Sequence, residues 1–140
     1  FQIDGLLHGG IKSKFQKEQF ETLCLKLNLI PVAPLWELEP KKYMNNLLDS
    51  GFNFMMTTVS SDGLDEQWLG KLILKYDIEI LHNLSSKFGF NLNFEGGEAE
   101  TFVINCPLFS NPIKINKFIK NWDGYRGRFE IVDAELNYNA

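Results

Sequence analysis

Residues 52–59, Phe-Asn-Phe-Met-Met-Thr-Thr-Val, form an apolar and β-branched run that predicts a β-strand. Residues 60–63, Ser-Ser-Asp-Gly, follow it with side chains typical of turns. Immediately before it, Pro40 suits a first helical turn, apolar residues at 43, 44, 47 and 48 share one helical face, and Gly51 ends the pattern. A helix that leads into a buried strand is a building unit of α/β sheets, so this stretch decides the expected class of fold.

The same order of elements is expected upstream. Apolar residues recur over 1–7 and predict a strand, and apolar residues at 20, 23, 24 and 27 predict a helix over 14–28. Ser13 and Gln16 have the spacing of a capping box at the start of that helix. Residues 29–33 predict a second short strand. The β-α-β-α-β order over residues 1–59 is typical of a parallel sheet.

The remainder of the chain has a different rhythm. A short helix or turn is predicted within residues 64–75, and a helix capped by Asp77 is predicted to end at Gly89. Three alternating stretches, residues 100–105, 113–119 and 128–136, then predict strands, and a change of phase at residues 131–132 predicts a bulge. The expected class is therefore α/β, with residues 60–140 forming an α+β region.

The composition excludes several classes of function. The chain has 140 residues, 44% of them hydrophobic and 23% charged, and a net charge of −4, so the positive charge needed to bind duplex nucleic acid is missing. No apolar run approaches the roughly 18–20 residues that span a bilayer. Cys24 and Cys106 are too few and too far apart for a disulfide framework or a zinc site. We expect no metal site of this chain's own, no membrane or nucleic-acid partner, and a reducing, cytoplasmic setting.

The beginning of the chain suggests that the sequence is a portion of a longer protein. It starts with Phe1 rather than Met and enters a predicted strand at once. Any function predicted from these residues must therefore allow for residues outside them.

An acidic loop is the most unusual segment of the sequence. We define it as residues 94–100, in which Glu95, Glu98 and Glu100 surround the adjacent glycines Gly96 and Gly97. Paired glycines let a loop bend around a ligand, so the three carboxylates are expected to point into one small volume. Crowded carboxylates suit proton transfer or the binding of a cation. The alternative is a solvated acidic turn between residues 90–92 and the next strand.

A second candidate site lies at the junction of the first strand and the first helix. Gly9 and Gly10 precede Ser13 and Gln16, and the N-terminus of a helix offers free N–H groups to a phosphate. The spacing matches neither a Walker loop nor a dinucleotide fingerprint. The alternative is that these residues only cap the helix.

The acidic loop also carries a resemblance to a known family. Residues 95–109, Glu-Gly-Gly-Glu-Ala-Glu-Thr-Phe-Val-Ile-Asn-Cys-Pro-Leu-Phe, resemble the signature of the diphthine-ammonia ligases, which are relatives of the N-type ATP pyrophosphatases. That signature reads Gly-Glu-Gly-Gly-Glu-Tyr-Glu-Thr, followed by Asp-Cys-Pro-Leu-Phe. Other blocks occur in the family's order, and the resemblance covers most of residues 5–109. Phe94, Ala99 and Asn105 stand where the pattern has Gly, Tyr and Asp.

The resemblance implies a fold and an activity. Residues 1–59 would complete a Rossmann-like nucleotide-binding sheet, and residues 60–140 would form a substrate-facing α+β region. The complete protein would use ATP to adenylate diphthine on translation elongation factor two and would amidate it with ammonia to diphthamide. No Ser-Gly-Gly-x-Asp-Ser pyrophosphate loop occurs in this sequence. Mg²⁺ would therefore be held mainly by residues that the sequence lacks, and a homo-oligomer is compatible with this reading.

The resemblance also implies roles for individual residues. Two alternatives remain open, namely a paralogue that activates a different carboxylate and a non-catalytic module that grips a basic partner with the acidic loop. The expected catalytic residues are Glu95, Glu98 and Glu100, the nucleotide-binding residues are Gly9, Gly10, Ser13 and Gln16, and the substrate-binding residues are Gly96, Gly97, Thr101 and Cys106.

Overall fold

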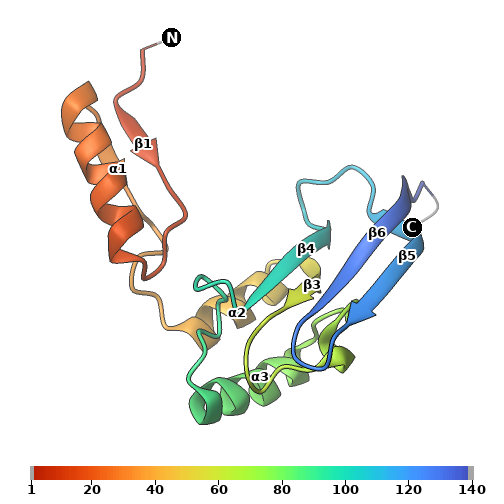
Figure 1. Cartoon of the computed structure of the whole chain (residues 1–140). Helices are drawn as coiled ribbons and strands as arrows, with labels where there is room; N and C mark the ends of the chain where they lie inside the picture. The colour runs from red at the N-terminus through yellow and green to blue at the C-terminus, as the bar shows by residue number, and fades with distance from the viewer. Residues whose placement is uncertain (1, 139–140) are drawn as a thin grey trace. The chain divides into compact units, whose positions relative to one another are not determined.

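The computed structural model describes residues 2–138 (Figure 1). They form two compact units that divide between Glu39 and Pro40. This division differs from the expected functional division at residues 59 and 60, which stays a prediction. Both helices and strands are present, so the α/β class is confirmed.

The first unit contains two strands and one helix. β1 (Gly5–Leu7) pairs in parallel with β2 (Ile30–Val32), and α1 (Lys14–Leu27) connects them. The Ser13 hydroxyl accepts the backbone N–H of Gln16 at 3.4 Å, which caps α1 as predicted. At the other end Asn28 has a φ of 54°, in the left-handed conformation that commonly ends helices.

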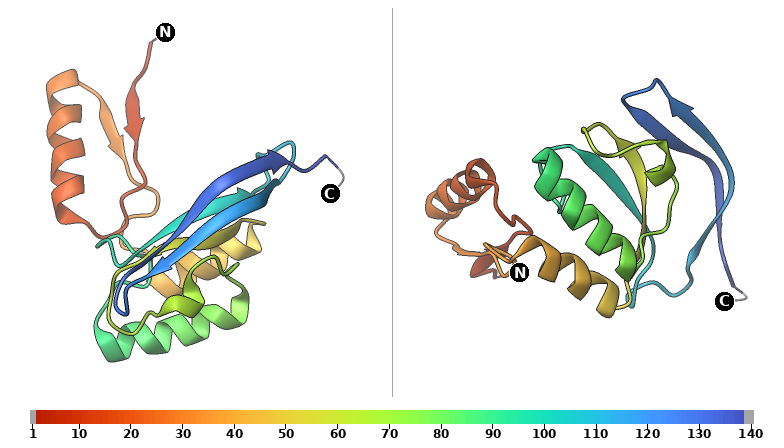
Figure 2. Two further views of the ribbon diagram at one scale, coloured as in Figure 1. Left: turned by 45° about the vertical axis from the view of Figure 1, so that its right-hand side comes forward. Right: turned by 90° about the horizontal axis from the view of Figure 1, so that it is seen from below.

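The second unit packs two helices on one face of an antiparallel sheet, as Figure 2 shows. The elements are α2 (Pro40–Asp49), β3 (Asn53–Val59), η1 (Glu66–Trp68), α3 (Lys75–Phe88), β4 (Ala99–Asn105), β5 (Ile113–Trp122) and β6 (Gly127–Leu136). The strand order in the sheet is β4-β3-β6-β5. The short 3₁₀ helix η1 and the helix α3 connect β3 to β4.

The pairing of β3 differs from the prediction. The strand forms where expected, but it pairs antiparallel with β4 and β6, so the expectation that it continues a parallel sheet is wrong. Phe54, Met55 and Met56 are all buried, although neighbouring side chains point to opposite faces. A strand that is covered on both faces reads as a continuous apolar run, which is the pattern that parallel strands usually show.

Both edges of β3 are also occupied. β4 pairs along one edge, and β6 pairs along the other edge only at Thr58 and Val59. Residues 69–73 complete that second edge, because Gly70 N–H donates to the Met56 carbonyl at 2.8 Å and Ile73 N–H donates to the Phe54 carbonyl at 3.0 Å. The backbone of β3 is therefore satisfied along its length by segments far apart in the sequence.

The helix α3 begins three residues before its predicted start, so the prediction that Asp77 is its N-cap is wrong. Its N-cap is Leu74, and the fully buried Asp77 accepts the Leu74 backbone N–H at 3.0 Å. Asp77 also forms an ion pair with Lys71. The carboxylate thus holds residues 71–74 against the first turn of α3, and Gly89, with a φ of 80°, ends the helix as predicted.

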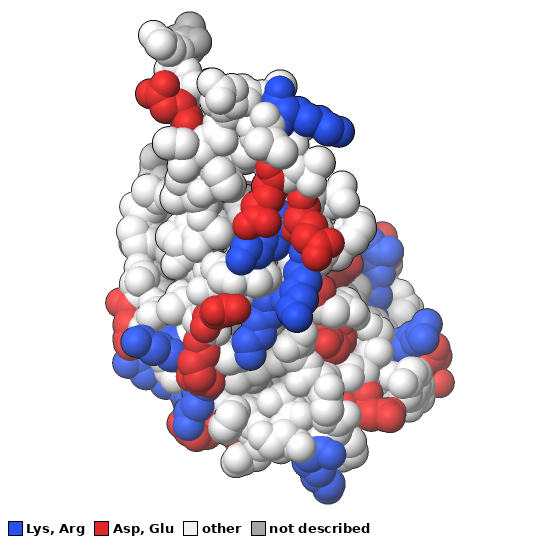
Figure 3. All heavy atoms as spheres, turned by 90° about the vertical axis from the view of Figure 1, so that its left-hand side faces the viewer, with Lys and Arg blue, Asp and Glu red and all other residues white. Residues whose placement is uncertain are grey.

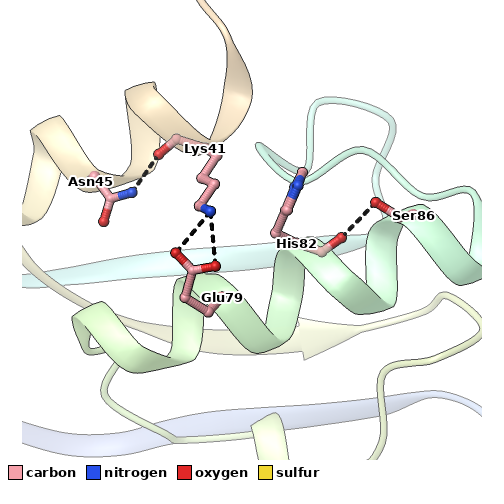
Figure 4. Close-up of polar contacts among 5 residues, drawn as sticks. All are labelled: Lys41, Asn45, Glu79, His82 and Ser86. Atoms are coloured by element: carbon pink, nitrogen blue, oxygen red, sulfur yellow. Dashed lines mark hydrogen bonds and ion pairs between the residues drawn. The ribbon is translucent and has the colours of Figure 1, made fainter.

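Polar contacts join α2 to α3 on the surface (Figure 4). Lys41 Nζ lies 2.8 Å from both carboxylate oxygens of Glu79. Within the helices, Asn45 donates to the Lys41 carbonyl and Ser86 to the His82 carbonyl, each at 2.9 Å. An exposed ion pair of this kind contributes about 0–1 kcal/mol, so it orients the helices more than it stabilises them.

The hairpin of β5 and β6 turns at residues 123–126. The Asp123 carboxylate accepts the backbone N–H groups of Arg126 at 2.7 Å and Tyr125 at 2.9 Å. Asn116 and Val132 are left out of the strand register, which confirms the bulge predicted at residues 131–132. No helix among the described residues is long and apolar enough to cross a membrane.

Replacing Gly127 with alanine should destabilise the second unit. A Cβ there would lie 2.4 Å from the Leu69 side chain and 2.9 Å from the Asn121 carbonyl oxygen, and the backbone atom cannot move aside easily. We expect Gly127→Ala to lower the free energy of unfolding by about 1–3 kcal/mol in urea denaturation. The exposed helix variant Asn46→Ala should change it by less than about 0.5 kcal/mol. Equal stability of both variants would contradict this packing.

The turn should also make stability depend on pH. The hydrogen bonds from Arg126 N–H and then Tyr125 N–H hold the pKa of Asp123 below its ordinary value of 3.8. The ionised carboxylate therefore favours the folded turn, and its contribution is present above pH 3.8 and is lost as the pH falls through the folded-state pKa. An NMR titration of Asp123 should give a midpoint below 3.8. A midpoint at or above that value would show that the turn does not stabilise the charge.

Candidate functional site

The acidic loop is braced by one of its own carboxylates. Glu98 Oε1 accepts the backbone N–H of Asn91 at 3.0 Å, and Glu98 Oε2 accepts the backbone N–H of Gly96 at 2.9 Å. Hydrogen bonds from N–H groups to an ionised carboxylate are stronger than neutral ones. A Cβ on Gly96 would lie 2.5 Å from Glu98 Oε1, so glycine lets the backbone approach this closely. Glu98 therefore fixes the conformation of the loop.

The end of β3 holds the same loop from outside. Ser60 donates its backbone N–H to the Glu98 carbonyl at 2.8 Å and its hydroxyl to the Gly97 carbonyl at 2.6 Å. Gly97 has a φ of 81°, which favours glycine at this position. One residue further into β4, the Glu100 carbonyl accepts the Thr57 hydroxyl at 3.3 Å. The loop is thus anchored to the central strand of the sheet.

The three glutamates have different surroundings. Glu98 is turned toward backbone N–H groups, whereas Glu100 is exposed on β4. Glu95 lies close enough to Tyr43 of α2 that, after burial of the phenol, its negative charge further raises the pKa of Tyr43. Among residues 2–138, no group of three or more His, Cys, Asp and Glu side chains could hold a metal ion. That the loop gathers its three carboxylates into one small volume, and that they are catalytic, both stay predictions.

Phe94 has an unusual backbone conformation. Its φ is 60°, a value that a bulky residue rarely adopts, and its ring is buried with its centroid 6.3 Å from that of Phe90. This is the position at which the family signature resembled by the sequence has Gly. The left-handed backbone explains the glycine of the signature, and in this chain the position carries a buried ring instead.

A pocket of about 220 Å³ lies beside the acidic loop, bounded by α2, β3, β4 and residues 93–94. We call it the aromatic pocket. The sequence does not predict this pocket, because apolar residues at the periods of a helix or a strand are typical of a packed core. Its polar and aromatic lining consists of Tyr43, Phe52, Phe54, Asn93, Phe94 and Thr101.

The structure places the two remaining substrate-binding candidates in different surroundings. Thr101 follows Glu100 on β4 and lines the aromatic pocket. Cys106 is buried directly after β4, where its carbonyl accepts the Phe109 backbone N–H at 3.0 Å. Thr101 is thus available to a ligand, whereas the surroundings of Cys106 favour a structural contribution.

The nucleotide-binding candidates lie together at the start of α1 in the first unit. A Cβ on Gly9 would meet nothing within 4 Å, so the backbone is open there. Gly10 is buried and donates its N–H to His8 Nδ1 at 3.3 Å, and the His8 ring stacks on Phe20 at 4.4 Å. Ser13 caps the helix through Gln16 N–H. His8, which was not among the predicted site residues, shapes the glycine turn.

Comparison with known proteins places the second unit in a family. A family model described as the diphthamide synthase C-terminal domain matches residues 39–136. The chain belongs to this family. The match begins where the second unit begins and ends with β6, so the diphthamide synthase C-terminal domain corresponds to the sheet, its two helices and the acidic loop.

Curated relatives of this diphthamide synthase domain agree with the family model. The diphthine--ammonia ligase of Danio rerio is 36% identical over 115 residues, which are 81% of this chain and 45% of that protein. The proteins of the same name from Mus musculus and Schizosaccharomyces pombe are 34% and 33% identical, over 82% and 79% of this chain and 43% and 18% of their own lengths. The chain therefore spans about half the length of the vertebrate relatives that it matches.

Substitution of Glu98 and Glu100 should separate loop structure from chemistry. In Glu98→Gln one side-chain oxygen is replaced by an NH₂ group, which cannot accept the N–H of Asn91 or Gly96. We expect large shifts of these two amide signals in NMR spectra and a loss of about 1–3 kcal/mol of stability. Glu100→Gln, at an exposed position, should leave both amides unchanged. Unperturbed amides in Glu98→Gln would contradict the bracing role.

Proposed function

We propose that this chain is part of an ATP-dependent ligase that amidates diphthine on translation elongation factor two with ammonia. The observation that carries the proposal is the family match over residues 39–136, which includes the whole acidic loop. The relatives that match are named diphthine--ammonia ligase. The residues of both units are compatible with this chemistry, as follows.

Amide formation from a carboxylate requires activation, because a free carboxylate is a poor acyl donor to ammonia. ATP supplies that activation when it is bound. The first turn of α1 is compatible with a bound anion, because it contains Lys14 and Lys17 and no acidic residue. The N-terminus of a helix is also the positive end of the helix dipole. In our proposal Gly9, Gly10, Ser13 and Gln16 bound the nucleotide, with Mg²⁺ held mainly by other parts of the protein.

The second unit supplies the substrate side. We assign Glu98 as a positioning residue, because both of its carboxylate oxygens accept backbone N–H groups. Glu100 is exposed at the edge strand β4 and is the better candidate to orient or deprotonate ammonium. Gly96 and Gly97 give the loop its shape, and Thr101 lies beside the aromatic pocket.

The charge of the surface is compatible with a protein substrate rather than a nucleic acid. The net charge of the chain is −4. On the face shown in Figure 3, acidic and basic side chains are both present, and neither sign forms a continuous field. We propose that the protein acts in the cytoplasm, where elongation factors work.

Full-length protein that contains this chain should bind ATP and amidate diphthine-bearing elongation factor two. Glu100→Gln should lower turnover by roughly 100-fold with little change in ATP affinity, because a general base contributes about that much. Gly9→Ala should weaken ATP binding in calorimetry without loss of stability, since its Cβ would meet no atom of residues 2–138 within 4 Å. Mass spectrometry of the elongation factor reports the amide. A full-length protein that binds ATP but leaves diphthine unmodified would refute the proposed substrate.

A further inference from the structure

The aromatic pocket combines several rings with a small number of polar groups. Tyr43 comes from α2 and Phe94 from the acidic loop. Phe54 lies in β3, and Phe52 directly precedes that strand. The volume of about 220 Å³ equals about seven water molecules in the liquid. It can hold a group of four or five heavy atoms together with part of the chain that carries it.

A carboxylate lies beside this pocket. No Lys, Arg or His side chain is among the residues that line it. The Glu95 carboxylate acts on Tyr43, whose pKa is raised by burial and then by that negative charge. Glu95 also accepts a long hydrogen bond of 3.5 Å from Asn93 Nδ2, which connects the carboxylate to the pocket wall.

One polar atom of the wall has no partner. Asn93 Oδ1 is buried and accepts no hydrogen bond within residues 2–138. A buried acceptor without a partner costs about 1–3 kcal/mol, so the Asn93 oxygen can be satisfied by a ligand or an ordered water in the pocket. The Asn93 oxygen adds a second negative partial charge beside the rings.

We propose that the aromatic pocket binds a quaternary ammonium group, with the rings of Tyr43, Phe52 and Phe94 around its methyl groups and Glu95 as the counter-charge. Aromatic faces attract such cations through their quadrupole, and a cage of rings is a recurrent way to hold methylated ammonium. The inference rests on the proposed function, because diphthine carries a trimethylammonium group.

The polar groups favour a methylated cation over Lys or Arg. A primary ammonium has three N–H donors and a guanidinium has five, and each buried donor needs an acceptor. The pocket offers mainly rings, one amide oxygen and two hydroxyl groups. A quaternary ammonium has no N–H, and its polarised C–H groups can contact Asn93 Oδ1.

The test uses the 140-residue chain, choline as the cation and 3,3-dimethylbutan-1-ol as its uncharged isostere. We expect choline to give saturable NMR shifts of Thr101, Val103 and the Met44 methyl group, and the uncharged alcohol to give much smaller ones. Equal binding of both compounds, binding that shifts only residues away from the pocket, or no choline binding would each overturn the proposal.

Variants identify the source of the affinity. Phe52→Leu keeps an apolar side chain but removes a ring, and Glu95→Gln removes the charge, so each should weaken choline binding by roughly two- to thirty-fold. Glu130→Gln changes an exposed carboxylate on β6, away from the pocket, so it should not weaken choline binding comparably. Circular dichroism verifies that each variant is folded. If Phe52→Leu and Glu95→Gln both bind like the unchanged chain, the cage is not the site.

The pocket and the proposed function can fail separately. Full-length protein that amidates diphthine while this chain does not bind choline would refute the pocket and leave the ligase function intact. If this chain binds choline but the full-length protein does not amidate diphthine, the quaternary ammonium site is supported and the ligase function is refuted. In an active full-length enzyme, Phe52→Leu should raise KM for the elongation factor more than it lowers kcat.

Discussion

The backbone of β3 is hydrogen-bonded along both edges, to β4 on one side and to β6 and residues 69–73 on the other. Its two faces are also covered, since Phe54 lies toward α2 and Met55 lies toward the side chains of β5 and β6. A strand held in this way has a fixed register. Ser60, which follows β3, therefore provides a rigid support from which the acidic loop can be held.

Glu98 in turn fixes the conformation of the acidic loop. A carboxylate that accepts two backbone N–H groups restricts the segment between Asn91 and Gly96 to a narrow set of conformations. The same contacts withdraw its oxygens from a substrate. The arrangement of adjacent glycines and glutamates therefore encodes the shape of the loop, and Glu100 is the exposed member of its three glutamates.

The helices, the strands, one helix cap and one bulge could be predicted, because each depends on a local pattern. The cap at Ser13 and the bulge at Val132 follow from spacing within a few residues. The partner of β3 could not be predicted in this way, since burial of both faces by distant segments gives an antiparallel strand the appearance of a parallel one. The role of Glu98 could not be predicted either, because the donors that its carboxylate accepts are backbone N–H groups, which leave no trace in the sequence.

Phe94 shows how a departure from a family signature can be informative. The backbone at this position is left-handed, so glycine would be the residue of lowest strain, yet the chain places a buried ring there. Strain that persists at one residue is retained when the surrounding structure compensates for it, and it occurs preferentially near binding sites. The ring contacts Phe90 and completes the wall of the aromatic pocket.

The two units differ in the charge that surrounds their candidate binding sites. The first turn of α1 carries lysines and the positive end of a helix, whereas the pocket is aromatic and lies under the influence of Glu95. Under the proposed function, the first of these surroundings suits the nucleotide and the second suits a cationic group.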